Sequence, residues 1–255
     1  MKSERLRRLR REFVALSAEY EDRLGDRREY IVLKRDHSLR VHALAMRIVA
    51  GERLSRPELH WAAALVHDIG RFSQFERFGT YRDDESVDHG NEGAEVLLRG
   101  RFLDSFAPED RARIVETVRL HNKRELPPGL DPVTSSLCAV VRDADKLDIV
   151  PVVLGKMSPD KPRDPVITLG LADEPESWTE SIFEAVASDE SPSYMQLRVV
   201  NDFKLLLASW GPKLEFATSR RLFARRGYLD RLFDLLPKAP CLAVLKADLD
   251  RRLAR

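Results

Sequence analysis

Apolar side chains recur every three to four residues along most of the chain, which is the spacing of one buried helix face. Period-two alternation and internal repeats are absent from the sequence. The pattern therefore predicts an all-α fold. A first helix is predicted over residues 3–24, with one face formed by Leu6, Leu9, Phe13 and Leu16.

Start and stop signals set the next helices. A second helix is predicted from about Asp36 to Gly51, because a glycine commonly ends a helix. Residues 55–58 read Ser-Arg-Pro-Glu, a capping-box pattern with proline in the first turn, which predicts a helix ending at Gly70. Glycine and charged residues favour an irregular loop over 71–87. Further helices are predicted at 88–99, 108–121 and 132–150.

The composition changes after residue 150. Residues 151–192 hold six of the fourteen prolines, which predicts a long structured loop with at most one short helix. Helices are predicted at 193–210 and 218–236, before a short C-terminal segment. We interpret the chain as a single domain, with a helical core at 1–150, the Pro-rich loop, and a helical extension at 193–255. The extension packs either on the core or on a second subunit of a homodimer through the stripe Leu197, Val200, Phe203, Leu207 and Trp210.

The charge balance excludes several classes of protein. Lys and Arg number 43 and Asp and Glu 42, so the formal net charge is +1. We therefore expect neither membrane nor general nucleic-acid binding through bulk charge. No apolar run reaches the ~18 residues of a membrane span, and the basic N-terminus lacks the apolar core of a signal peptide. Cys138 and Cys241 cannot supply a disulfide framework or a thiolate zinc site, so a reducing, cytoplasmic location is expected.

Histidines and aspartates fall on the inner faces of five successive predicted helices. A polar side chain that shares a helix face with apolar residues points into the interior. Side chains placed in this way on neighbouring helices of a bundle meet in a common core. The residues concerned are, in chain order, His37, His67, Asp68, His89, His121 and Asp145.

A shared core of this kind requires a cation. A buried carboxylate costs several kcal/mol unless it is paired or bound to a cation, and the sequence offers Asp68 and Asp145 no evident buried arginine. A divalent metal accepts lone pairs from carboxylates and imidazoles alike. One buried histidine or one His-Asp dipeptide is more often structural. The full order over five helices is far more specific and predicts a metal centre.

This order of ligands resembles the HD-domain superfamily of metal-dependent phosphohydrolases over about residues 30–150. The local sequences LVHDIG at 65–70, LHN at 120–122 and RDADKL at 142–147 support the resemblance. It implies an all-α bundle with the metals at its middle. It also implies a first metal at His37, His67, Asp68 and Asp145, and a second metal at Asp68, His89 and His121, with Asp68 as the bridge.

The resemblance implies hydrolysis of a phosphate ester or anhydride in a small, nucleotide-like substrate by a metal-activated hydroxide. Nitrogen and oxygen ligands with open positions suit one or two divalent ions of Fe, Mn, Co, Ni or Mg better than a structural zinc. Residues 122–128 read NKRELPP and lack the Gly-Tyr-Pro signature of the cyclic-di-nucleotide phosphodiesterases, which disfavours that substrate class.

Basic side chains beside the predicted ligands are candidates for contact with a phosphate. We assign Asp68 and Lys146 to catalysis and Arg71, Lys123 and Arg124 to substrate binding, with a solvated surface as the alternative for the four basic residues. The same ligand order occurs in HD-type mixed-valence di-iron oxygenases, which form the second functional hypothesis. A non-catalytic metal or nucleotide sensing module is the third.

Overall fold

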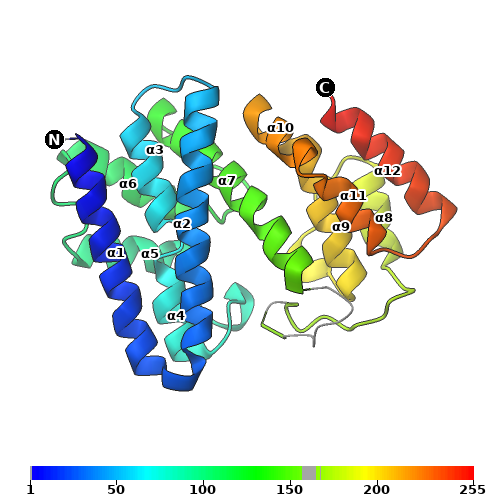
Figure 1. Cartoon of the computed structure of the whole chain (residues 1–255), viewed down its shortest axis with the longest axis horizontal. Helices are drawn as coiled ribbons and strands as arrows, with labels where there is room; N and C mark the ends of the chain where they lie inside the picture. The colour runs from blue at the N-terminus through cyan, green and yellow to red at the C-terminus, as the bar shows by residue number, and fades with distance from the viewer. Residues whose placement is uncertain (1, 157–164, 167) are drawn as a thin grey trace. The chain divides into compact units, whose positions relative to one another are not determined.

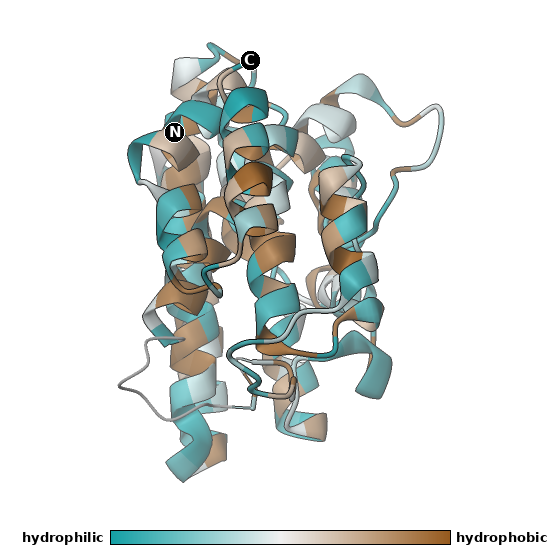
Figure 2. Cartoon of the chain, turned by 90° about the vertical axis from the view of Figure 1, so that its right-hand side faces the viewer, coloured by the Kyte–Doolittle hydropathy of each residue, from teal (hydrophilic) through white to brown (hydrophobic). Residues whose placement is uncertain are grey.

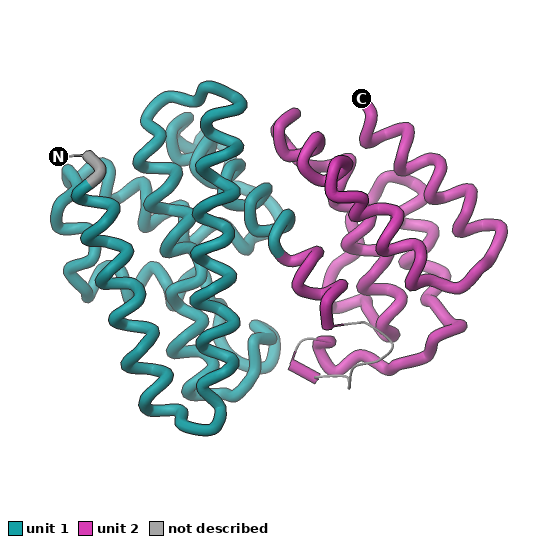
Figure 3. The backbone as a smooth tube through the Cα atoms, in the orientation of Figure 1, with its two compact units in different colours: residues 1–148 teal, residues 149–255 magenta. Residues whose placement is uncertain are grey.

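In the computed structural model the chain is built from α-helices and short 3₁₀ helices (Figure 1). Among the described residues, β pairing is limited to one isolated bridge between Ala172 and Val199, so the all-α prediction is confirmed. The helices form two compact units, 1–148 and 149–255, shown in teal and magenta in Figure 3. The predicted packing of residues 193–255 on the core stays a prediction. The structure describes residues 2–156, 165–166 and 168–255.

The first unit opens with two long helices that lie side by side (Figure 1). They are α1 (Lys2–Leu24) and α2 (Arg28–Gly51), joined by the 3₁₀ turn η1 (Gly25–Arg27). Leu9 and Phe13 of the predicted stripe on α1 are fully buried. The chain continues through α3 (Pro57–Val66), α4 (Gly70–Phe78), η2 (Asp83–Glu85), α5 (His89–Arg99), α6 (Pro108–Leu120) and α7 (Pro132–Lys156).

The irregular loop predicted over 71–87 is wrong in its first half. The segment Gly70–Phe78 forms α4, because Phe72 and Phe75 lie one turn apart and are both fully buried. Gly79 ends this helix in the left-handed conformation, with φ of +68°, which a residue without a Cβ adopts easily.

Two helix starts also differ from the prediction. α2 begins at Arg28 rather than near Asp36. The capping box at 55–58 does not form, because the residue before α3 is Arg56 in the left-handed conformation and no side chain caps the helix. Pro57 occupies the first turn as expected, where its missing N–H has no intrahelical partner to lose.

The starts of α4 and α5 lie against each other without room for side chains. A Cβ on Gly70 would lie 2.4 Å from the backbone nitrogen of Gly93 and 2.4 Å from the carbonyl oxygen of His89. Only a glycine therefore permits this approach. This close contact holds the turn that carries Asp68 beside His89, the first residue of α5.

The second unit surrounds a central helix, α9 (Val200–Trp210), whose residues are all buried. All five residues of the predicted apolar stripe are buried, which confirms them as core. The helices carry hydrophobic and hydrophilic faces (Figure 2). The expected short C-terminal segment is instead a 14-residue helix, α12. The other elements are α8 (Glu180–Ala187), η3 (Tyr194–Gln196), η4 (Gly211–Lys213), α10 (Ala217–Arg225), α11 (Tyr228–Asp234) and α12 (Pro240–Leu253).

None of the described helices is both long and apolar enough to cross a bilayer.

Candidate metal centre

The structure brings the six predicted ligands together in the first unit. They come from the middle of α2, the turn after α3, the start of α5, the turn after α6 and the middle of α7. Five of them are buried and Asp145 is half-buried. The cluster consists of His37, His67, Asp68, His89, His121 and Asp145.

Asp68 lies between two pairs of histidines. Its Oδ2 atom is 3.6 Å from Nε2 of His37 and 3.8 Å from Nε2 of His67. Its Oδ1 atom is 3.5 Å from Nε2 of His89 and 3.6 Å from Nε2 of His121. Each carboxylate oxygen thus faces one pair, which is the arrangement of a carboxylate able to bridge two cations.

Asp145 completes the group on one side of Asp68. Its Oδ1 atom is 3.0 Å from Nε2 of His37 and 3.8 Å from Nε2 of His67. The first pair of histidines therefore faces two carboxylates, whereas the second pair faces Asp68 alone. The division into a four-ligand and a three-ligand metal site stays a prediction.

Helix ends orient two of the histidines. His67 and His121 directly follow the last residues of α3 and α6, where the final carbonyl groups lack intrahelical partners. Nδ1 of His67 donates to the carbonyl of Ala64 at 2.9 Å, and Nδ1 of His121 donates to that of Val118 at 2.7 Å. A carbonyl only accepts hydrogen bonds, so in the neutral ring the proton lies on Nδ1 and Nε2 presents a lone pair.

Two aspartates outside the predicted set orient the other histidines. Nδ1 of His37 lies 2.7 Å from Oδ2 of Asp148, and Nδ1 of His89 lies 2.6 Å from Oδ2 of Asp83. Carboxylates behind metal-binding imidazoles commonly fix the tautomer and the ring orientation in this way. Asp148 has a sequence signal, since it follows Asp145 by one helical turn, whereas Asp83 lies in a 3₁₀ turn and has none.

The converging nitrogens have no protein partner suited to their lone pairs. Nε2 of His67 is buried and makes no hydrogen bond among the described residues. Nε2 of His89 lies 3.1 Å from Nε2 of His121, although each ring donates from its Nδ1 atom. Two sets of ligand atoms, one from His37, His67 and Asp145 and one from His67, Asp68 and His121, each lie within 4.8 Å of one another. The residues present therefore fit divalent cations.

Comparison with known protein families identifies the segment that carries this cluster. Residues 35–149 match the family model of the HD domain. The chain carries an HD domain. The matched segment includes all six clustered residues, and the resemblance seen in the sequence is confirmed. Comparisons with the curated proteins and with the solved structures found no match.

The electrostatics of the HD domain favour the protonation states of metal ligands at Asp68 and His89. Burial raises the pKa of Asp68, but Lys34 and His67 outweigh it and hold that pKa well below its usual range. Burial and then Arg71 lower the pKa of His89 to about 3, so its ring is neutral. Burial lowers the pKa of His37, but hydrogen bonds to the carboxylates on either side raise it overall, and a metal would replace its Nε2 proton.

Two basic side chains, one of them an arginine, contact Asp68, so the expectation that it has no buried arginine beside it is wrong. Nζ of Lys34 lies 2.9 Å from Oδ2, and Nε of Arg71 lies 3.5 Å from Oδ1. Lys34 precedes His37 by one turn on α2, in the part of the helix that the sequence analysis did not assign. Arg71 is held by the carbonyl of Tyr81 at 2.6 Å and by Asp83 at 3.0 Å.

The other predicted basic residues surround the cluster at different depths. Lys123 forms an ion pair with Asp88, the N-cap residue of α5. Arg124 is exposed, and Lys146 is half-buried on α7 next to Asp145. Their assigned roles in substrate binding and catalysis stay predictions.

Proposed function

We propose that the HD domain hydrolyses a phosphate ester or anhydride of a small, nucleotide-like substrate with the help of divalent metal ions. The observation that carries this proposal is the convergence of four imidazole Nε2 atoms on Asp68 and Asp145, with Lys34 and Arg71 beside Asp68. The match of residues 35–149 to the HD domain, which generally occurs in metal-dependent phosphohydrolases, supports it.

The candidate metal ligands form two sets that share Asp68. Divalent ions such as Mn, Fe, Co, Ni or Mg suit these nitrogen and oxygen donors. Bound there, they supply Lewis-acid activation of water and neutralise negative charge on phosphoryl oxygens. The first ion would be held by His37, His67, Asp68 and Asp145, and the second by Asp68, His89 and His121.

Lys34 and Arg71 provide the charge that recognises a phosphate. Their side chains are 18% and 14% exposed, so they face the cluster in a largely water-free setting where charge interactions are strong. Once cations compensate Asp68, the ammonium and guanidinium groups are available to donate hydrogen bonds to phosphate oxygens. Lys123, Arg124 and Lys146 would extend substrate contact from the flanks.

Hydrogen bonds to the Nδ1 atoms of the imidazole rings hold the Nε2 atoms in place before substrate binds. Asp148 and Asp83 hold the rings of His37 and His89 with Nε2 directed at Asp68. Preorganised ligands of this kind need little rearrangement during the reaction.

The test is metal-dependent phosphate release. The metal-stripped protein is reloaded with each candidate ion and assayed on phosphate monoesters and on nucleoside mono-, di- and triphosphates. We expect turnover that Asp68→Asn abolishes. The control His42→Ala should retain it, because the His42 ring bonds the carbonyl of Trp61 and is not part of the cluster.

The same samples separate hydrolysis from the oxygenase hypothesis. Oxygen uptake by the iron-loaded protein, with a coupled-spin signal in electron paramagnetic resonance and no phosphate release, would refute hydrolysis and leave the metal centre in place. Metal binding without any turnover across the substrate panel would instead favour a sensing module.

A further inference from the structure

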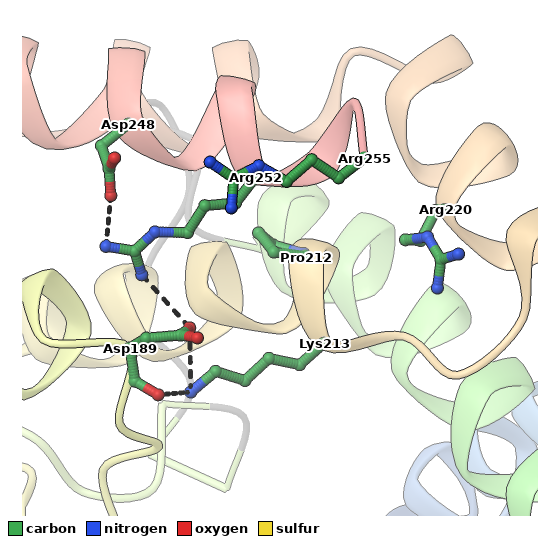
Figure 4. A pocket seen from close by; sticks show the side chains of 7 residues that line it. All are labelled: Asp189, Pro212, Lys213, Arg220, Asp248, Arg252 and Arg255. Carbon is green, nitrogen blue, oxygen red and sulfur yellow. Dashed lines mark hydrogen bonds and ion pairs between the residues drawn. The ribbon is translucent and has the colours of Figure 1, made fainter.

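A polar cavity lies wholly within the second unit (Figure 4). Its volume is about 350 Å³, which is within the range of small-molecule sites. Pro212 is its one apolar lining residue, so its walls suit a polar ligand. The lining residues come from the segment after α8, from η4, α10 and α12, and from the end of the chain: Asp189, Pro212, Lys213, Arg220, Asp248, Arg252 and Arg255.

The cavity carries more positive than negative charge. Four basic side chains and two carboxylates line it. Nη1 of Arg252 lies 3.2 Å from Oδ1 of Asp189, and Arg252 also pairs with Asp248. Nζ of Lys213 lies 3.7 Å from the same Asp189 oxygen. The two carboxylates are therefore engaged by Lys213 and Arg252, which leaves the charge of the other two arginines uncompensated.

Those two arginines are Arg220 and Arg255. Among the described residues, no carboxylate lies within ion-pair distance of either guanidinium. Nη1 of Arg220 donates to the carbonyls of Leu214 at 2.7 Å and Glu215 at 3.1 Å, which fixes its guanidinium at the cavity wall. A guanidinium has five N–H groups, so Nε and Nη2 of Arg220 keep donors for a ligand.

We propose that this cavity binds a small phosphorylated anion through Arg220 and Arg255. Guanidinium groups match phosphate oxygens with paired hydrogen bonds, and the excess of basic over acidic side chains suits a phosphate anion. The partial immobilisation of Arg220 lowers the entropy lost when a ligand binds. The site uses no residue of the HD domain and needs no metal ion, so it is independent of the proposed hydrolase activity.

The test uses pyrophosphate as the probe and the full chain after metal removal with a chelator. Isothermal titration calorimetry should show saturable binding that weakens as salt concentration rises. Arg220→Gln and Arg255→Gln should each weaken binding by about tenfold or more, the effect of losing hydrogen bonds between charged groups. The matched control is Arg221→Gln on the same helix, because Arg221 is exposed and does not line the cavity; it should change affinity less than about twofold.

The comparison of the two arginine variants keeps the outcome decisive. Arg220→Gln also removes two hydrogen bonds to the turn at Leu214 and Glu215, whereas the side chain of Arg255 makes no hydrogen bond among the described residues, so Arg255→Gln tests the charge alone. Binding of pyrophosphate that is unchanged in both Arg220→Gln and Arg255→Gln would place the anion elsewhere on the chain and overturn the proposal. An absence of saturable binding, or equal losses in Arg220→Gln and Arg221→Gln, would overturn it as well.

Discussion

The substitution Asp148→Asn should weaken the binding of one metal ion selectively. Oδ2 of Asp148 lies 2.7 Å from Nδ1 of His37, and both oxygens accept hydrogen bonds from Arg40, at 2.8 and 2.9 Å. The residue is only 3% exposed, so water cannot replace its carboxylate. Asparagine keeps the size but removes the charge, and the hydrogen bond that holds the His37 ring is no longer charge-assisted.

The magnitude follows from the position of Asp148 behind the ligand. Loss of a carboxylate that orients a metal-binding histidine typically lowers metal affinity by about 10–100-fold, which corresponds to about 1.4–2.8 kcal/mol. The loss should fall on the ion held by His37. The other ion, held by His89 and His121, shares only Asp68 with it and should change by less than about threefold. Asp83→Asn should give the reverse result, because Asp83 orients His89.

The assay is a titration of the metal-stripped protein with Mn²⁺ against a competing chelator, fitted to two binding steps. His89→Ala identifies the second step, since it should abolish that step and preserve the first. Circular dichroism verifies that each variant is folded. If Asp148→Asn and Asp83→Asn weaken the same step, or if neither weakens any step, the division of the cluster around Asp68 is wrong.

Three other predictions concern stability and protonation. Gly70→Ala should lower the free energy of unfolding by about 1–3 kcal/mol, because its Cβ would clash with backbone at 2.4 Å; thermal melts should show no comparable loss for Gly155→Ala, where a Cβ meets nothing within 4 Å. Trp210→Ala should lower the free energy of unfolding by about 3–5 kcal/mol, because it leaves a cavity in the core, and should leave the metal content unchanged. A variant with normal stability and assembly but no turnover would contradict the role of Trp210 in the core. The control is Tyr194→Ala, at a 49% exposed position, which should have a small effect. In the metal-free protein, nitrogen chemical shifts of the His89 ring should report a neutral side chain down to about pH 4. Its pKa of about 3 lies below the ordinary value of 6.5, so its contribution to stability is complete above pH 6.5 and is lost as the pH falls toward 3; protonation of this ring near pH 6.5 would contradict the burial argument.

The ligands of the cluster were predictable because most of them repeat the spacing of buried helix positions. His37 and Asp145 lie inside long helices, where an apolar face shows which side chains point inward. His67 and His121 lie one residue beyond helix ends, close enough for the same periodicity to hold. The HD resemblance then assigned these residues to metals, which periodicity alone could not do.

The groups that support the ligands were not predictable by the same reasoning. Lys34 is not predictable because the start of α2, which carries it, lacks a clear periodic apolar pattern. Asp83 reaches His89 from a 3₁₀ turn, and only tertiary structure brings the two together. Nothing in the sequence separates Arg71 from surface arginines such as Arg124. The burial of Arg71 depends on its place in α4, and the glycine and polar residues of this segment indicate a loop instead of a helix.

The most direct test of the metal centre is anomalous diffraction from crystals of the Mn²⁺-loaded protein. The structure predicts two peaks, one on each side of Asp68. The first should lie within about 2.0–2.3 Å of ligand atoms from His37, His67 and Asp145, and the second within the same distance of His89 and His121. A peak elsewhere with none beside Asp68, or ordered Nε2 atoms that hydrogen-bond only to water at full metal loading, would contradict the account.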